Sequence, residues 1–207
     1  MDNHFIAYMY RLRYIKRWSL MRNTTRENVA EHSYHVALLS HLLCEIGNQV
    51  FGRSLNADRA AAIALFHDAT EVFTGDIPTP VKHHNPRMLS NFRELEAMAA
   101  DRLVNMVPEP LKDVYEPLLR EHAMPGESLT QLSEEERELR RMVKAADLLD
   151  AYIKCLSELS SGNREFAVAK GQIEQSLAKL NLPETEWFLH HMASAFSKTL
   201  DELSVDE

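Results

Sequence analysis

Apolar residues recur with the 3.6-residue period of an amphipathic helix along nearly the whole 207-residue chain. No window alternates polar and apolar residues for long enough to predict a strand. Only 6 glycines and 8 prolines interrupt the pattern, so the helices are expected to be long. Hydrophobic residues make up 45% of the chain, enough for a sizeable core. The sequence therefore predicts an all-α fold, a single domain over residues 1–207.

The predicted helices have recognisable beginnings and ends. Asn28 and Glu31 fit a capping box at the start of the second helix, and Asn56 is the predicted cap of the third. Two prolines and a glycine exclude helix from 74–80. Polar residues predict a loop at 123–133, to which we assign no role. The helices are expected at about 3–13, 28–47, 56–72, 87–106, 111–122, 134–160, 164–180 and 184–203.

Charge and composition narrow the function classes. The formal net charge is −8, from 23 Lys and Arg against 31 Asp and Glu, which argues against a surface for nucleic acid polymers. A small phosphate substrate is not excluded, because one local cation can outweigh the net field. Cys44 and Cys155 lie in apolar contexts and are interpreted as buried reduced thiols. Without a signal-peptide core or an 18-residue apolar run, the chain is expected to be cytoplasmic and to bind no membrane.

Three ionisable residues occur together where the third predicted helix ends. A His-Asp pair alone is uninformative, since such a pair is expected by chance roughly 0.5 times per chain of this composition. Here, however, His67 and Glu71 are four residues apart and are predicted to share a helix face, with Asp68 beside them. An irregular loop follows, which is where a rigid scaffold can hold ligands beside an open mouth. The arrangement favours a metal or catalytic site.

A metal ion needs further protein ligands, and two other predicted helices carry suitable residues. His32 lies in the first turn of the second helix. Asp147 follows the apolar stretch 143–146, where a carboxylate should not be buried without a cation. On the residues alone, Asp147 as an ordinary carboxylate on a helix surface stays an open alternative.

The order His…His-Asp…Asp on separate helices resembles the signature of the HD superfamily of metal-dependent phosphohydrolases. Arg17-Trp18 and the segments around the four residues make the resemblance closer, to the bacterial 5′-deoxynucleotidases, from about residue 4 to 203. The resemblance implies an HD-domain helical bundle whose core spans about 28–160. The segments that carry it are 27–33 (ENVAEHS), 67–71 (HDATE), 74–82 (TGDIPTPVK) and 144–147 (KAAD).

The resemblance also implies an activity, a cofactor and an assembly. One divalent metal ion would be held by His32, His67, Asp68 and Asp147. This mixed nitrogen and oxygen set suits Mn²⁺, Co²⁺, Fe²⁺ or Zn²⁺ better than Ca²⁺, with Co²⁺ or Mn²⁺ expected first. A metal-activated water would hydrolyse deoxyribonucleoside 5′-monophosphates to deoxyribonucleoside and phosphate. Relatives of this type are homodimers, so a homodimer is expected.

The same resemblance assigns roles around the metal. Glu71 would be the catalytic carboxylate that positions or deprotonates water, and Asp76 would protonate the leaving 5′-oxygen. Arg17 would orient the phosphate for catalysis, and Trp18 would leave no room for a 2′-hydroxyl. Alternatively, Glu71 is a solvated glutamate, Asp76 a turn residue and Trp18 a core aromatic. The implied substrate-binding set is Arg17, Trp18, His32, Asp68, Asp76, Ile77, Pro78, Thr79 and Asp147.

Two rival functions remain at this point. A phosphohydrolase of the same superfamily could act on another nucleotide or on a phosphodiester, but Arg17-Trp18 favours the monophosphate. A non-catalytic domain could instead keep the metal as a structural staple and sense nucleotides. Glu71 and Asp76 favour the enzyme, because a structural site needs no additional carboxylates beside its ligands.

Overall fold

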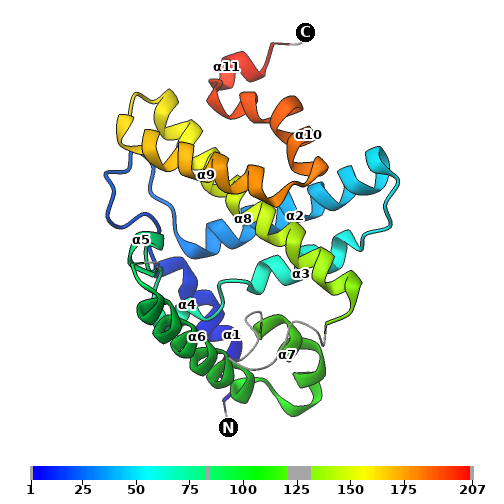
Figure 1. The fold of residues 1–207 in the computed structure, drawn as a ribbon. Helices are drawn as coiled ribbons and strands as arrows, with labels where there is room; N and C mark the ends of the chain where they lie inside the picture. The colour runs from blue at the N-terminus through cyan, green and yellow to red at the C-terminus, as the bar shows by residue number, and fades with distance from the viewer. Residues whose placement is uncertain (1, 83, 121–131, 206–207) are drawn as a thin grey trace. The chain divides into compact units, whose positions relative to one another are not determined.

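The computed structural model describes residues 2–82, 84–120 and 132–205. Within these ranges the chain is all-α, as predicted, and an isolated bridge between Lys16 and Asn28 is the only β-type pairing (Figure 1). Short 3₁₀ segments are η1 (Tyr10–Tyr14), η2 (Glu109–Leu111), η4 (Arg164–Phe166) and η5 (Ala193–Ser197). The α-helices are α1 (Phe5–Met9), α2 (Val29–Phe51), α3 (Ala57–Phe66), α4 (Glu71–Thr74), α5 (Thr79–Lys82), α6 (Pro86–Met106), α7 (Lys112–Leu119), α8 (Glu134–Ser160), α9 (Ala167–Leu180), α10 (Pro183–His191) and α11 (Leu200–Leu203).

Both predicted helix starts are confirmed. The Asn28 side chain accepts from the Glu31 backbone at 3.1 Å, and Glu31 accepts from the Asn28 backbone at 3.2 Å, which completes a capping box. Asn56 accepts from the Arg59 backbone at 2.9 Å. The predicted end of α2 at 47 is too early. The helix continues to Phe51, and Gly47 lies inside it, where a Cβ would come within 3.1 Å of Glu184 Oε1; the glycine therefore allows close packing and does not end the helix.

The prediction of one helix over 56–72 is wrong at its functional end. Helix α3 stops at Phe66, and tight three-residue turns join it to α4, with Glu71 N donating to Asp68 O at 3.0 Å. The His67 side chain explains the break, because its Nδ1 lies 2.7 Å from Ala64 O, the carbonyl that would continue the helical ladder. His67 and Glu71 therefore do not share a helix face.

Two further expectations are corrected. The irregular segment expected at 74–80 ends earlier, because α5 starts at Thr79 and contains Pro80, which needs no N–H in a first helical turn. The helix expected at 184–203 is divided into α10, η5 and α11. Most of the predicted loop at 123–133 lies outside the described residues.

Contacts group the residues into two compact units, which are described separately. One comprises Met1–Leu20, Arg26–Tyr34 and Ala62–Arg137. The other comprises Met21–Thr25, His35–Ala61 and Glu138–Glu207. The single domain over 1–207 stays a prediction.

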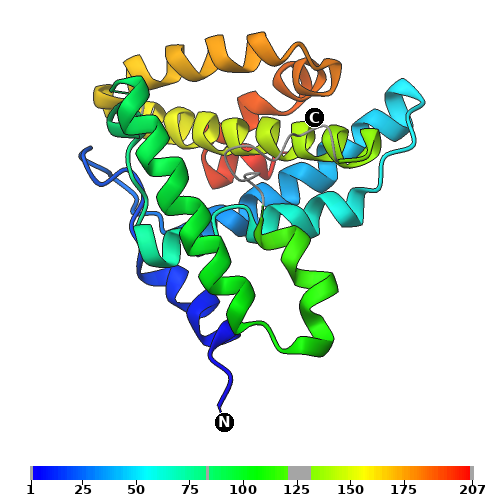
Figure 2. The same ribbon diagram turned by 60° about the horizontal axis from the view of Figure 1, so that its bottom comes forward.

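In the first unit, a buried cluster fixes the turn after α3. Helices α4 and α5 pack against α6 (Figures 1 and 2), and Phe5 meets Tyr115 edge-to-face at 5.2 Å between ring centroids. Ala69 is 1% exposed, so the turn that carries His67 and Asp68 is anchored in the core. The buried cluster consists of Phe5, Ala69, Leu103, Val104, Val107 and Leu119.

In the second unit, Glu158 joins the 24–25 segment to the end of α8. Its carboxylate is 1% exposed and accepts hydrogen bonds from Thr24, Thr25, Asn163 and Lys154. Burial raises the pKa of Glu158, but these hydrogen bonds outweigh burial and lower the pKa to about 2. The segment is thus held by an ionised, buried carboxylate.

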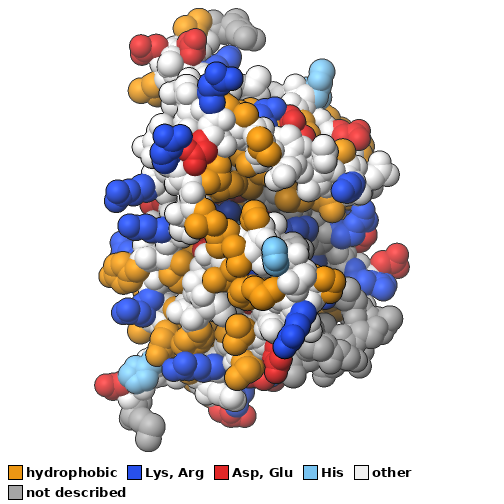
Figure 3. Space-filling view, turned by 60° about the vertical axis from the view of Figure 1, so that its left-hand side comes forward, with side chains coloured by type: hydrophobic (Ala, Val, Ile, Leu, Met, Phe, Trp, Pro, Cys, Tyr) orange, Lys and Arg blue, Asp and Glu red, His pale blue; other side chains and the backbone are white. Residues whose placement is uncertain are grey.

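The surface is mixed in character. Lys and Arg side chains are distributed over the face drawn in Figure 3, with apolar and acidic side chains between them. None of the helices described is both long enough and apolar enough to cross a membrane. Both cysteines, Cys44 and Cys155, are free and buried as expected, and burial raises the pKa of each thiol to about 12.

Acid should weaken the folded chain through Glu158. Its pKa lies below the ordinary value of 4.5, so its contribution to stability is complete above that value and is lost as pH falls towards about 2. We expect the urea midpoint of wild type to exceed that of Glu158→Gln at about pH 6, and the gap to narrow at about pH 3. An equal gap at both pH values would contradict this assignment.

Candidate active site

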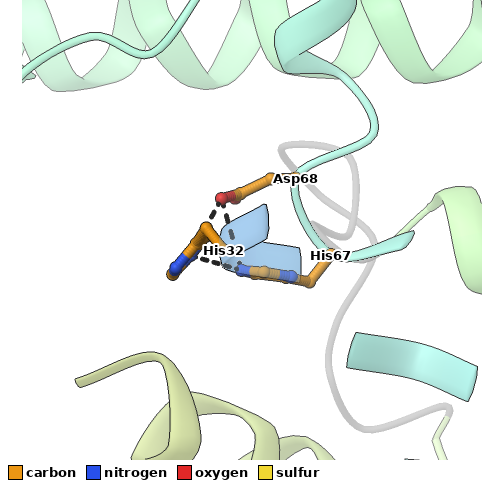
Figure 4. Close-up of side chains that lie close together, drawn as sticks. All are labelled: His32, His67 and Asp68. Atoms are coloured by element: carbon orange, nitrogen blue, oxygen red, sulfur yellow. Dashed lines mark hydrogen bonds and ion pairs between the residues drawn. The ribbon is translucent and has the colours of Figure 1, made fainter. Parts of the chain in front are cut away.

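Three donor atoms from two segments of the first unit converge on one point. His32 is fully buried in α2, and His67 and Asp68 lie in the turn after α3. The two Nε2 atoms are 3.2 Å apart, and Asp68 Oδ2 lies 3.4 Å from that of His32 and 3.3 Å from that of His67 (Figure 4). Three of the four predicted metal ligands are thus brought together.

The surroundings of His67 fix which nitrogen faces this point. Its Nδ1 lies 2.7 Å from the carbonyl oxygen of Ala64, and a carbonyl can only accept a hydrogen bond. Nδ1 therefore carries the proton and Nε2 presents a lone pair to His32 and Asp68. A ligating histidine whose other nitrogen is held by a carbonyl is the arrangement that metal sites use.

The spacing of the donor atoms fits a transition-metal ion. Atoms ~2.1 Å from a shared ion, at angles of about 90–109°, lie about 3.0–3.4 Å apart. The three observed separations span 3.2–3.4 Å. His67 Nε2 presents a lone pair and Asp68 a carboxylate oxygen to this point, and both are ligand atoms that a divalent cation attracts. The residues present therefore fit a divalent metal ion.

Asp68 also contacts a cation of the chain. Burial raises its pKa, but His67 and His32 outweigh burial and hold the pKa well below its ordinary value, so Asp68 is ionised. Arg17 Nη1 lies 3.7 Å from Asp68 Oδ2. The predicted phosphate-orienting arginine therefore adjoins Asp68, one of the predicted metal ligands.

Glu71 is buried at the start of α4 and is 5% exposed. Among the described residues, its Oε2 has no hydrogen-bond partner. Burial raises the pKa of Glu71 to about 9, and the charges of Asp68 and Asp76 add to that effect. A cation beside Asp68 would oppose this shift. The alternative of a solvated glutamate is wrong for this position.

The loop between α4 and α5, together with the first residue of α5, carries four residues of the predicted substrate set. Gly75 turns the chain at φ +70°, and Asp76 follows it. Burial is the largest cause of the raised pKa of Asp76, and Asp68 raises it further, while Arg17 lowers it. Ile77 and Pro78 are half-buried, and Thr79 is exposed.

Arg17 and Trp18 follow Lys16, which forms the isolated bridge with Asn28. The Arg17 backbone N–H donates to Glu27 O at 3.0 Å. Trp18 has φ +55°, a left-handed conformation that is rare for a bulky side chain and costs of the order of 1–3 kcal/mol. Such strain accumulates at functional sites, so it supports a role for Trp18 beyond ordinary packing.

Asp147, the fourth predicted ligand, lies on α8 in the second unit. Its carboxylate accepts from Lys144 Nζ at 2.7 Å, and its side chain is 24% exposed. Its membership of the metal set stays a prediction.

Glu27 and Lys82 also lie at this site, although the sequence assigned neither a role. Glu27 lies 2.7 Å from Arg17 Nε. Lys82 contacts Glu96 at 3.2 Å, and the charges of Glu96 and Glu71 raise its pKa although burial lowers it. The signal was available, since both residues lie inside the segments that carry the resemblance.

Comparison with known proteins identifies the family. Residues 4–196 match the family described as 5′-deoxynucleotidase YfbR-like. A 5′-deoxynucleotidase of Klebsiella pneumoniae subsp. pneumoniae is 46% identical over 99% of this chain and 98% of its own length. The Escherichia coli 5′-deoxynucleotidase YfbR is 45% identical over the same shares. This chain belongs to the YfbR-like 5′-deoxynucleotidase family.

Solved structures support the fold of this YfbR-like chain. An HD-domain phosphohydrolase from Listeria innocua superposes with a TM-score of 0.75 at 21% identity, covering 93% of this chain and 88% of its own. The cyanophage S-2L HD phosphohydrolase DatZ, bound to dA and one catalytic Zn²⁺ ion, superposes at 0.58 with 19% identity, covering 91% and 95%. The predicted HD-domain fold and family are confirmed.

The site makes a direct prediction about metal binding. His67→Ala should bind Mn²⁺ or Co²⁺ far more weakly than wild type, because one of the converging donors is removed. His191→Ala is the matched control, since its Nδ1 also contacts a carbonyl, that of Trp187, at 2.8 Å. Titration with the metal alone, followed by elemental analysis, measures both variants. Undiminished metal binding by His67→Ala would contradict the site.

Proposed function

We propose that this chain is a metal-dependent 5′-deoxynucleotidase that converts deoxyribonucleoside 5′-monophosphates to deoxyribonucleosides and phosphate. The observation that carries the proposal is the triangle of His32, His67 and Asp68, with Arg17 3.7 Å from Asp68. A cation site beside a guanidinium suits a substrate that brings a phosphate dianion. The family supplies the substrate class.

The proposed metal ligands are His32, His67, Asp68 and Asp147, and the proposed metal ion is Co²⁺ or Mn²⁺. A divalent ion there supplies Lewis-acid chemistry, activating water and neutralising charge on the phosphate. Zn²⁺ belongs among the ions to be tested, because the cyanophage relative is described with a catalytic Zn²⁺ ion.

The residues of the chain carry the protons and hold the substrate. Glu71 accepts the proton of the attacking water, whose oxygen bonds to phosphorus as the bond to the 5′-oxygen breaks. Asp76 donates a proton to that leaving oxygen, a role that its raised pKa favours. Arg17 orients the phosphate throughout. His32, Asp68 and Asp147 would contribute to substrate binding as residues that hold the metal, and Ile77, Pro78 and Thr79 would complete the nucleoside pocket.

Trp18 is proposed to select deoxyribose. An indole against C2′ excludes a 2′-hydroxyl sterically, and a packed interior does not easily expand to admit an oxygen. The strained φ of Trp18 supports this role, because the backbone there maintains an unfavourable conformation to present the ring.

We also propose that the chain works as a homodimer in the cytoplasm. Its two free, buried thiols suit a reducing compartment. The dimer rests on the family resemblance, and light scattering of the purified chain tests it.

Phosphate release tests the whole proposal. Purified chain is treated with a chelator and then incubated with deoxyribo- and ribonucleoside monophosphates and a phosphodiester, each with Co²⁺, Mn²⁺ or Zn²⁺ restored. The proposal expects efficient release from the deoxyribonucleotides and poor release from the ribonucleotides, and only with metal. Activity that survives complete metal removal, or phosphate release chiefly from the phosphodiester, would contradict the proposed function.

Replacing Glu71 should separate turnover from metal binding. Glu71→Gln keeps the shape but cannot accept a proton, so kcat should fall by about 10²–10⁴-fold. Metal content should match wild type, as should that of Glu94→Gln, an exposed glutamate of α6 that serves as the control for the substitution. If Glu71→Gln loses its metal, Glu71 is a ligand and the assigned role is wrong.

Replacing Trp18 should change the choice of sugar. Trp18→Ala should narrow the deoxy-to-ribo ratio of kcat/KM, whereas Arg17→Ala should weaken both sugars alike because it acts on their common phosphate. The Trp187 ring stacks on His191, and Trp187→Ala is the control, which should leave the ratio unchanged. The ratio is measured for one base in both sugar forms. An unchanged ratio in Trp18→Ala would show that selectivity lies elsewhere.

A further inference from the structure

Glu27 is an acidic residue beside the site that the mechanism above does not use. Its Oε1 accepts from Arg17 Nε at 2.7 Å, and both side chains are only 12% exposed. Such burial limits screening by water, so the pair is stronger than an ordinary surface ion pair. The contact is reinforced by the backbone, because Arg17 N also donates to Glu27 O at 3.0 Å.

The contact fixes the orientation of the guanidinium. A guanidinium is planar, so holding Nε constrains where the two Nη atoms point. In this structure Arg17 Nη1 lies 3.7 Å from Asp68 Oδ2, on the edge of the His32, His67 and Asp68 cluster. The guanidinium therefore extends from Glu27 at one edge to the candidate metal site at the other.

We propose that Glu27 is a positioning residue that sets the angle at which Arg17 presents its guanidinium to the substrate phosphate. This inference rests on the proposed function, since it concerns the phosphate of that substrate. Orientation matters because a phosphate held about 1 Å from its reactive position can cost a hundredfold in rate. Glu27 touches no reacting atom and acts through Arg17.

A competing explanation is that Glu27 acts through His32. Glu27 Oε1 lies 4.0 Å from His32 Nδ1, on the side of the ring away from Asp68. That separation exceeds hydrogen-bonding distance, whereas the contact with Arg17 is a short, charge-assisted hydrogen bond. The geometry favours Arg17, and the two explanations predict different effects on bound metal.

The test is a double-mutant cycle of Glu27→Gln and Arg17→Ala, with kcat/KM measured on one deoxyribonucleoside monophosphate. Glu27→Gln should lower kcat/KM by about ten- to a hundredfold in wild type. In the Arg17→Ala background the same change should have less than about a twofold effect, because no guanidinium remains to be oriented. Metal content should be unchanged by Glu27→Gln. An equal loss in both backgrounds, or loss of metal from Glu27→Gln, would overturn the proposal.

Glu165→Gln is the matched control. Glu165 holds Arg22 Nε at 2.6 Å in the second unit, but that arginine side chain is 92% exposed. The control should leave kcat/KM unchanged within about twofold, as expected for an exposed ion pair. A loss in Glu165→Gln as large as that in Glu27→Gln would mean that breaking any such pair suffices, which contradicts a specific role.

Binding of inorganic phosphate to the metal-loaded full chain, measured by calorimetry, separates this inference from the proposed function. Glu27→Gln should weaken phosphate binding in wild type and not in Arg17→Ala. If this coupling is present but no deoxyribonucleotide is hydrolysed, the proposed function fails and the positioning role stands. If hydrolysis occurs without the coupling, the positioning role fails alone. A wild-type chain that binds no phosphate overturns both.

Discussion

Two imidazole nitrogens and a carboxylate oxygen lie 3.2–3.4 Å apart at one buried point, and the rest of the site follows from that proximity. Such a group is unfavourable in a protein interior without a cation. Two local interactions hold it in place. The Ala64 carbonyl fixes His67 and ends α3, and Ala69 anchors the following turn in the core. The break in the helix is therefore what creates the site, because an uninterrupted α3 would carry these residues along a regular helix.

Acidic and basic side chains surround this point and have opposite effects on the pKa values of Glu71 and Asp76. Burial is the largest cause of the raised pKa values of Glu71 and Asp76; the charge of Asp68 raises both further and that of Asp76 raises Glu71, while Arg17 and Lys82 lower both. Each cation is in turn held by a carboxylate outside the cluster, Arg17 by Glu27 and Lys82 by Glu96. Protonation of the two proposed proton carriers therefore depends on neighbours that are fixed in geometry. A divalent ion added to this set would favour the ionised form of Glu71, as a base requires.

Much of this was accessible from sequence, for identifiable reasons. Helical period and capping residues depend on local interactions, so the all-α fold and the starts of α2 and α3 could be predicted. The position of the break after Phe66 could not, because it depends on one side chain competing for a carbonyl. The roles of Glu71, Asp76 and Trp18 came from family resemblance. Those roles stay proposals, which the burial of Glu71, the raised pKa of Asp76 and the backbone strain at Trp18 support; the contact between Glu27 and Arg17 required coordinates.

The central claim is that the His32, His67 and Asp68 triangle holds the metal ion on which catalysis depends. The most direct measurement is an anomalous difference map from crystals of the full chain grown with Mn²⁺. One strong peak is predicted within about 2.0–2.3 Å of His32 Nε2, His67 Nε2 and Asp68 Oδ2. A peak elsewhere in the chain, with this triangle empty under conditions that support phosphate release, would contradict it.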